Sequence, residues 1–580
     1  MRLILFIFLF SFSYCWAQNN SKAAQRDPYL QNPVKNQPSK SKPAQKVRII
    51  NADNIILDDN YDGNRYFKGN VKLEHQGSFL YADIVVTYED ENFIRAIGNV
   101  KLQNQDGSVI TAEEMDYDGD TQKGVAKKKV VLTDPKGTII KTETMYYDRI
   151  SNQAYYNTGG TIFDGKTTTY SKSATYFLTN RTIDLTGRVK IVDKDYTLEG
   201  ENVVQDQNSN IVTINGYTTI TNNKNPKNRI ITEKGTHNSN TKESFLTKNS
   251  KIFYNDKILT GDEMYHNQIT GFGKATGNVT IDDPLEKRYI KGGYGEIFEK
   301  QDSAMMTKSP YAVKILEKDS IYFASEKILS YQKPDSADIT KKKSYIRAFR
   351  KARIYKSNAQ GRADSIAFNE NDGIMHMYKD PILWSGEKQV TGDKIEAYFN
   401  TETEDIDSLK VLGNGFAIAK VDSLNLLDEF HQVKGRLMSV YYEGGDIKEI
   451  KVIGNAESIT YVDEENKKTG SKDRIGVNIA TCGIIGALFS ERNLHIITCS
   501  IGAVAKTLPM SKISPQEKRF EDFNWNTKDR IRKWQDILVD SPNYEEIKYE
   551  PNDDLYNKIK EAQEKEKAIE EAKKPKRVRR

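Results

Sequence analysis

A phrase of four residues recurs along most of the chain and constrains its fold more than any other feature. The phrase is a small residue, an acidic residue, any residue and then an apolar residue. Its clearest copies begin at Ala52, Ala82, Ala112, Thr142, Gly200, Gly261, Ala363 and Gly392. Most successive copies lie about thirty residues apart, a period typical of small units that bury their apolar faces only by stacking on one another.

A second phrase, Gly-Asn followed by an apolar residue, lies between the copies of the first. It is intact at residues 69–71, 98–100 and 277–279. Apolar and polar residues then alternate, as in 71–73, and this period of two predicts a strand with one buried face. Because glycine allows a sharp bend, each unit is expected to contain a bend, a strand, a tight turn and a second, longer strand.

The predicted fold class is all-β: an elongated antiparallel jellyroll of two facing sheets, built from ~30-residue repeats, with a short α-helical C-terminal region. Thirteen units at ~4.8 Å per added strand would give a body on the order of 60 Å long. Hydrophobic residues make up only 37% of the chain, which suits a thin core. The 10% aromatic content excludes a disordered chain, and a net charge of +5 does not indicate a nucleic-acid partner.

Four segments are expected along the chain. Residues 1–17 are typical of a signal peptide, with a positive start, an apolar stretch and cleavage after about Ala17. Residues 18–45 form a linker rich in Pro, Lys and Asn, and residues 46–508 form the repetitive β body. Residues 509–580 are expected to be a helical, charged tail.

Two local patterns support a helix in the tail. Ser514, Pro515 and Glu517 form a typical helix start with a capping box. An apolar stripe at helical spacing follows, from Ile531 to Leu538. We therefore expect the tail to be separate from the β body, which should stay folded without it.

Motifs for catalysis, cofactors or metals are missing from the sequence. It contains no nucleophile elbow, phosphate-binding loop or dinucleotide fingerprint. His237 and His266 occupy the same place in neighbouring repeats, but a zinc site needs three or four ligands. Cys482 and Cys499 would either pair as a disulfide in an exported protein or remain two thiols. The sequence thus predicts no enzyme, no cofactor and no metal site.

The repeated phrases resemble those of a known family. Residues 69–73, followed by Gly77 and residues 80–85, look like the hallmark phrase of the periplasmic lipopolysaccharide-transport bridges of the LptA or OstA family. Residues 49–53 are similar to the opening of that family's domain. Repetition of both phrases extends the resemblance to about Ala456.

The resemblance implies a fold called a β-taco, with two sheets open along one edge. It also implies a role in the periplasm of a two-membrane bacterium, where such bridges carry lipopolysaccharide from the inner to the outer membrane. Edge strands would join the protein to LptC-like inner-membrane domains, to LptD-like outer-membrane domains and end to end to itself. The chain is longer than a usual bridge unit, and the extra length would replace several subunits or serve a related amphiphile.

Acyl chains would lie in an apolar groove between the two sheets. The residues expected to line this groove are Val71, Leu73, Val85, Val100, Leu102, Met115, Val130, Leu132, Met145, Val189, Ile191, Val203, Met264, Val279, Ile281, Ile366 and Ile395. Methionine at several of these positions would adapt to chains of different shape. The same residues would also fill a closed core, and the pattern alone does not separate the two arrangements.

Two functions of other classes remain as alternatives. An exported structural or adhesive β-repeat protein would share the pattern but would carry no lipid. A β-helical carbohydrate-active enzyme would need a cluster of carboxylates on adjacent rungs, and the sequence shows none. The short turn near Gly77 also favours hairpins over the parallel coils of such an enzyme.

Overall fold

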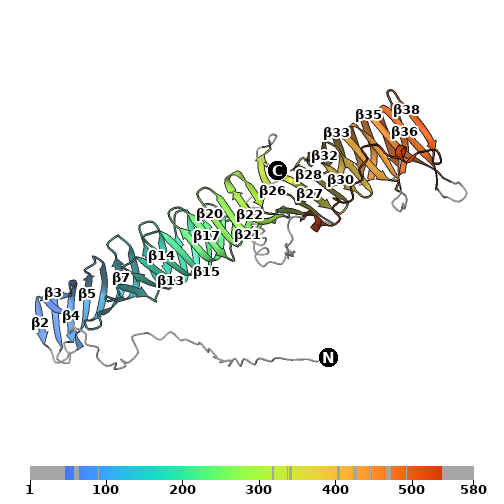
Figure 1. Ribbon diagram of the computed structural model, residues 1–580. Helices are drawn as coiled ribbons and strands as arrows, with labels where there is room; N and C mark the ends of the chain where they lie inside the picture. The colour runs from blue at the N-terminus through green and yellow to red at the C-terminus, as the bar shows by residue number, and fades with distance from the viewer. Residues whose placement is uncertain are drawn as a thin grey trace, which may run out of the picture.

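The body of the protein is a long, narrow stack of antiparallel strands, which confirms the all-β class (Figure 1). In this computed structural model the described residues are 46–57, 64–88, 91–316, 319–335, 338, 342–401, 405–421, 428–444, 446–465, 472–490 and 493–538. The first strands lie at one end of the rod and β35 to β38 lie at the other. The expected signal peptide and linker fall outside the described residues.

Many passes of the chain across the rod are single strands that bend near their middle. They are β3 (Arg65–His75), β4 (Ser78–Tyr88), β5 (Phe93–Gln103), β6 (Val109–Asp118), β7 (Lys123–Thr133), β8 (Ile139–Asp148), β13 (Thr182–Val192), β14 (Tyr196–Asp206), β15 (Ile211–Asn222), β16 (Arg229–Asn238), β21 (Phe272–Asp283), β22 (Arg288–Phe298), β27 (Lys342–Lys356), β28 (Ala359–Asn369), β33 (Ile406–Lys420), β34 (Phe430–Glu443), β35 (Asp446–Glu465) and β36 (Lys472–Ser490).

The other passes are split at the bend into two short strands. They are β1 (Arg48–Asn51) with β2 (Asn54–Leu57), β9 (Gln153–Tyr156) with β10 (Gly160–Phe163), β11 (Thr168–Ser171) with β12 (Ser173–Phe177), β17 (Glu243–Lys248) with β18 (Lys251–Tyr254), β19 (Lys257–Thr260) with β20 (Glu263–Asn267), β23 (Ser303–Thr307) with β24 (Tyr311–Ile315), β25 (Ser320–Ala324) with β26 (Lys327–Pro334), β29 (Ile374–Tyr378) with β30 (Ile382–Ser385), β31 (Lys388–Thr391) with β32 (Lys394–Phe399), and β37 (Asn493–Ser500) with β38 (Val504–Pro509). A short 3-10 helix, η4 (Glu299–Gln301), follows β22.

The two facing sheets are halves of one continuous sheet of 38 strands, folded lengthwise along the bends. Strand β5, for example, pairs with β6 on both sides of its bend, and the register shifts between Ile97 and Val100. Each repeat of about thirty residues therefore adds two passes to the stack rather than one. At ~4.8 Å per pass the rod is on the order of 130 Å long, about twice the expected length.

Hydrogen bonds between the two sequence phrases hold four of the bends. The Asn side chain of a Gly-Asn phrase donates to the carboxylate of the acidic phrase in the neighbouring pass. The intact pairs are Asn70–Asp53, Asn99–Asp83, Asn278–Asp262 and Asn414–Asp393, at 2.9–3.1 Å. The backbone of Asp53 also donates to the carbonyl oxygen of Gly69. The two phrases are therefore the two partners of one recurring contact.

The glycine in these bends is required by space as well as by conformation. Gly98 has φ +79°, and a Cβ there would lie 2.5 Å from the Asp83 carboxylate. That distance is shorter than any van der Waals contact, so a side chain would push the neighbouring pass away. The sharp bend therefore depends on glycine next to the acid.

Hairpin turns alternate between two rims that lie opposite the bends. The A rim contains the turns at 76–77, 104–108, 134–138, 164–167, 193–195, 223–228, 255–256 and 284–287. The B rim contains those at 119–122, 149–152, 178–181, 207–210, 239–242, 268–271 and 299–302. We call the strand portions next to each rim the A half and the B half. Their inward side chains form one continuous apolar core from Phe67 to Ile485.

The C-terminal segment differs from the expected α-helical region. Within residues 510–538 the only helices are two 3-10 helices, η5 (Pro515–Lys518) and η6 (Trp534–Leu538). The predicted capping box of Ser514 with Glu517 is present at η5, but the helix ends after one turn. Residues 539–580 of the expected tail lie outside the described part of the chain.

Residues 510–538, which we call the strap, run back along the outer face of the A half (Figure 1). Apolar strap residues cover outward apolar residues of successive strands. The contacts join Ile513 to Ile459, Tyr461 and Val477, join Phe520, Phe523 and Trp525 to Phe416, Ile418 and Phe430, and join Ile531 and Ile537 to Tyr311, Val313 and Ala324. The strap is thus part of the folded body, and the expectation of a separate tail is wrong for these residues.

Buried side chains of the sheet also bind the strap backbone. Gln389 donates to the Asn524 carbonyl oxygen at 2.7 Å, and Gln432 donates to that of Lys518 at 2.8 Å. These contacts, together with the aromatic packing, hold the strap in an extended course. A longer helix would withdraw those carbonyl groups from the sheet.

We expect Gly98→Ala to destabilise the N-terminal repeats more than Gly137→Ala. Both glycines have positive φ, but a Cβ at Gly137 meets no atom within 4 Å. Both variants carry the ~1–2 kcal/mol strain of a left-handed alanine, and only Gly98→Ala also forces a clash with Asp83. Hydrogen exchange of β4 and β5 measures the difference, and equal exchange in the two variants would contradict the role assigned to the bend.

We expect Ile537→Ala to loosen the strands beneath the end of the strap. Ile537 is only 1% exposed, and truncating a buried isoleucine costs about 2–5 kcal/mol. Amide exchange in β24, β25 and β27 should rise while exchange in β4 to β8 stays unchanged. Gln535→Ala, at an exposed position of η6, is the matched control, and an equal effect of both changes would argue against a structural strap.

Candidate functional site

The residues expected to line a groove all point into the core that runs along the rod. Each of the seventeen belongs to one continuous cluster and has at most 6% of its surface exposed. They come from successive passes in both the A half and the B half. The structure therefore brings these side chains together as one lengthwise apolar interior.

This interior is packed rather than hollow. The cavity in the middle of the rod has a volume of about 40 Å³, and one near the N-terminal end has about 20 Å³. Small-molecule sites usually measure roughly 300–1,000 Å³. The two halves must move apart before this interior can hold an acyl chain.

Polar contacts between the two rims close the mouth of the folded sheet. Residues in or next to the A-rim turns bind residues of B-rim turns, including the turn at 370–373, one or more repeats further along. The contacts are Gln76–Arg149, Asp106–Asn152, Asp134–Arg181, Lys136–Asn208, Lys166–Asn240, Asp193–Lys242, Asn255–Glu299, Lys257–Asp302 and Arg288–Glu370. Together they form a row of latches from the first repeats to the middle of the rod.

Several latches are ion pairs shielded from water. Arg181 lies 3.1 Å from Asp134, and Lys242 lies 2.8 Å from Asp193, with 2–16% of these side chains exposed. Burial opposes ionisation of Asp134, but hydrogen bonds from Tyr176 and Thr138 and the charge of Arg181 outweigh it and lower its pKa. Removing one partner of a buried pair costs about 3–5 kcal/mol, so the closed mouth is firmly held.

Buried histidine and tyrosine side chains lie just inside the latches. The ring of Tyr196 packs edge-on against that of His237 at 4.5 Å, and His266 bonds to Glu299 at 2.7 Å. Burial, together with the charge of Lys242, lowers the pKa of His237 to about 3. Among the described residues, the Tyr196 hydroxyl and Nε2 of His237 have no hydrogen-bond partner.

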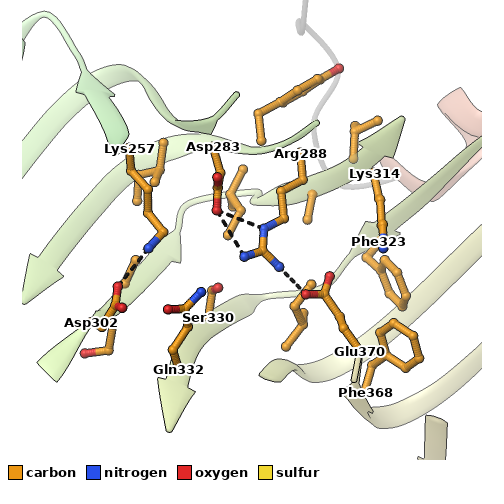
Figure 2. Close-up of a pocket in the computed structure, with 18 of the residues that line it drawn as sticks. Lys257, Asp283, Arg288, Asp302, Lys314, Phe323, Ser330, Gln332, Phe368 and Glu370 are labelled. Carbon is orange, nitrogen blue, oxygen red and sulfur yellow. Dashed lines mark hydrogen bonds and ion pairs between the residues drawn. The ribbon is translucent and has the colours of Figure 1, made fainter. Parts of the chain in front are cut away.

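The middle of the rod holds an inner cavity beneath an outer basin (Figure 2). The basin is polar and measures about 430 Å³, whereas the inner cavity is lined largely by apolar side chains. Lys257, Asp283 and Asp302 line both, so charged groups stand between the basin and the core. Figure 2 shows the Lys257–Asp302 pair and, beside it, Arg288 between Asp283 and Glu370.

Strands with an unpaired edge lie at both ends of the rod. At the N-terminal end β1 and β2 pair only with β3 among the described strands, and Ile55 is 64% exposed. At the C-terminal end β37 and β38 pair only with β36 within that same set, and Val504 is 70% exposed. Such edges with exposed apolar side chains are templates for strand addition.

A disulfide joins Cys482 on β36 to Cys499 on β37 in the last repeat. In the described part of the chain, no group of three or more His, Cys, Asp or Glu residues is arranged to hold a metal ion. None of the described helices has the length and apolar character to cross a membrane.

The geometry defines a class of protein: an elongated taco of repeated bent strands with one lengthwise apolar interior. Residues 44–201, from the start of the body into β14, match the family model described as OstA-like protein. This match confirms the resemblance inferred from the repeated phrases. Over residues 44–201 the chain is therefore similar to OstA-like proteins. The search of curated proteins found no match to the chain.

The latches were not predicted from the sequence. Acidic residues recur on the A rim at Asp106, Asp134, Asp164 and Asp193, at a spacing close to the repeat period. This recurrence is the sequence signal that could have indicated charged contacts at the rim. The partners of Asp106, Asp134 and Asp193, however, come from turns 46–49 residues away and vary between Asn, Arg and Lys. His237 and His266, which the sequence places at the same position in neighbouring repeats, both lie buried at the mouth.

Acidification should loosen the mouth around His237. Because its folded pKa of about 3 lies below the unfolded value of ~6.5, the unfolded state takes up a proton first. Stability is therefore complete above pH 6.5 and falls by up to ~1.4 kcal/mol per pH unit as the pH drops towards 3.

Hydrogen exchange of β14 to β17 at pH 7.5 and 4.5, corrected for the intrinsic rate, measures this loss. His237→Gln should flatten the pH dependence, whereas His495→Gln, at an exposed position of β37, should not. An unchanged pH dependence in His237→Gln would contradict the assignment.

Proposed function

We propose that the protein is a periplasmic bridge that carries lipopolysaccharide, or a related amphiphile, from the inner to the outer membrane. Acyl chains travel between the A half and the B half, while the hydrophilic part stays at the mouth. The observation that carries this proposal is the single apolar interior that runs from Phe67 to Ile485 behind a polar mouth. The OstA-like match of residues 44–201 supports it.

Transport requires the mouth to open, because the interior of this structure is packed. The latches are contacts that side chains of one rim make with the other rim, whereas the hydrogen-bonded sheet is continuous around the bends. Opening at the mouth therefore breaks side-chain contacts and leaves the backbone ladder intact. An acyl chain that enters replaces the apolar contacts between Val85, Met115 and their neighbours with contacts of the same kind.

The free edges at the two ends suit assembly into a longer bridge. A strand of a partner that pairs with β1 and β2, or with β37 and β38, would continue the sheet and the apolar interior together. LptC-like domains of the inner membrane and LptD-like domains of the outer membrane are the partners we propose, with end-to-end self-association as a further arrangement. An exported location, with signal cleavage after about Ala17, agrees with the Cys482–Cys499 disulfide.

An exported structural or adhesive protein is the second candidate function. The packed interior favours it, since a rod that only spans distance needs no opening. The two candidates differ in one measurable property, which is the presence of lipid between the halves. Mass spectrometry of material purified from the native envelope would show near-stoichiometric lipopolysaccharide for a carrier and none for a structural rod.

A photoreactive amino acid at Leu102 should crosslink to lipopolysaccharide in the native envelope, whereas the same residue at Lys101 should not. Leu102 points into the core and Lys101 is an exposed neighbour on β5. Immunoblotting with an antibody against lipopolysaccharide detects the adduct. Adducts at both positions, or at Lys101 alone, would contradict an internal lipid path, and the absence of any adduct would favour the structural candidate.

A further inference from the structure

The basin in the middle of the mouth contains two lysines that hold one carboxylate. Lys257 begins β19 on the A rim, and Lys342 begins β27 next to the B rim. Their Nζ atoms lie 2.7 and 2.9 Å from the two carboxylate oxygens of Asp302. Burial opposes ionisation of Asp302, but the two ammonium groups outweigh it and lower its pKa. This carboxylate is thus bound from both rims.

This pairing distinguishes the basin from the other charged latches. Asp134 and Asp193 each bind one basic side chain across the mouth, so removing either carboxylate would free a single cation. Removal of the Asp302 carboxylate would free two cations at once. The basin therefore contains a preformed cradle for an anion, which Asp302 occupies in this structure.

The side chains behind the cradle change from polar to apolar within a short distance. Tyr254, which is 1% exposed, lines the inner cavity, and within the described residues its hydroxyl has no hydrogen-bond partner. Phe323 and Phe368 lie on the far side of the same cavity (Figure 2). A buried hydroxyl without a partner is costly, and a bound polar group would satisfy it.

The charged groups beyond the cradle are already balanced. Arg288 binds both Asp283 and Glu370, and Lys314 lines the same cavity, so carboxylates and cations are equally represented there. The two basin lysines that share the Asp302 carboxylate are therefore the cations that an entering anion meets first, with apolar walls beyond them.

We propose that the basin is the binding site for the phosphorylated headgroup of the carried amphiphile. The phosphate replaces the Asp302 carboxylate between Lys257 and Lys342, and the attached acyl chain passes Tyr254 into the core between the halves. This inference rests on the proposed function, because it needs the interior to accept a chain. It adds the chemical class of the headgroup and the place where that group is held.

Phosphate competes well for this cradle. It carries more charge than a carboxylate and presents more acceptor oxygens, and lysine binds it as a compact charge. Asp302 lies in the left-handed region with φ 45° at the end of η4, a conformation that aspartate and asparagine tolerate. Replacing Asp302 with asparagine therefore removes the competing charge with little change to the backbone.

Binding of two single-chain probes to the full chain tests the proposal. Dodecyl phosphate carries the anion, and dodecyl maltoside carries the same chain without charge; both are used below their micelle concentrations. We expect the wild-type protein to bind dodecyl phosphate roughly tenfold more tightly, as one charge-assisted hydrogen bond would give. Asp302→Asn should strengthen dodecyl phosphate binding further, and Lys257→Gln with Lys342→Gln should abolish the preference.

Binding of dodecyl maltoside should stay unchanged in all these variants. Lys227→Gln is the matched control, because Lys227 also lines the basin but pairs with Asp256. Circular dichroism checks that each variant is folded. If the double lysine variant does not fold, Asp302→Asn still tests the site, because it should increase the affinity for dodecyl phosphate.

Equal affinity for both probes, unaffected by Asp302→Asn, would overturn the headgroup site and leave the proposed function intact. If neither probe binds the wild-type protein, the lipid path and the headgroup site are both refuted. Loss of the preference in Lys227→Gln would show a general charge effect and would also overturn the site.

Discussion

The contact between the Asp of one pass and the Gly-Asn pair of the next sets the architecture of the whole protein. It holds four sharp bends, and the row of bends folds one continuous sheet lengthwise so that its two halves face each other. The row of bends also sets the other features of the rod. The apolar interior lies between the two halves of the folded sheet, and the alternating turns form two rims opposite the bends. Glycine is required at these bends because a side chain there would collide with the carboxylate of the neighbouring pass.

The parts that could be predicted from the sequence are those fixed by this repeated contact. Both phrases are local and recur, so they gave the strand pattern, the all-β class and the inward residues from Val71 to Ile395. The rim contacts could not be predicted in this way, because Asp134 and Arg181 lie 47 residues apart and meet only once the sheet has folded. Nothing in the sequence near either residue shows that they meet.

The strap shows how tertiary contacts override a local signal. The capping box at Ser514 is real, and it led to the expectation of a helix. The aromatic residues that follow, Phe520, Phe523 and Trp525, each bury against the outer face of the A half, and a helix could not place all three there while Asn524 binds Gln389. The number of outward apolar residues on β33 and β34 was the signal that this face is covered.

The latches and the strap divide the rod into two regions held by different forces. From Gln76 to Glu370 the described rims are joined largely by polar contacts, which water or an anion can replace. Beyond Glu370 the side chains next to the B rim are apolar, as at Phe399, Ile406 and Tyr442, and the strap braces the A half from outside. Breaking a buried latch leaves a bare charge unless another charged group takes the place of the lost partner, and an anionic headgroup can do so. A chain with an anionic headgroup would therefore open the first region more readily than the second, and the basin lies where the first region ends.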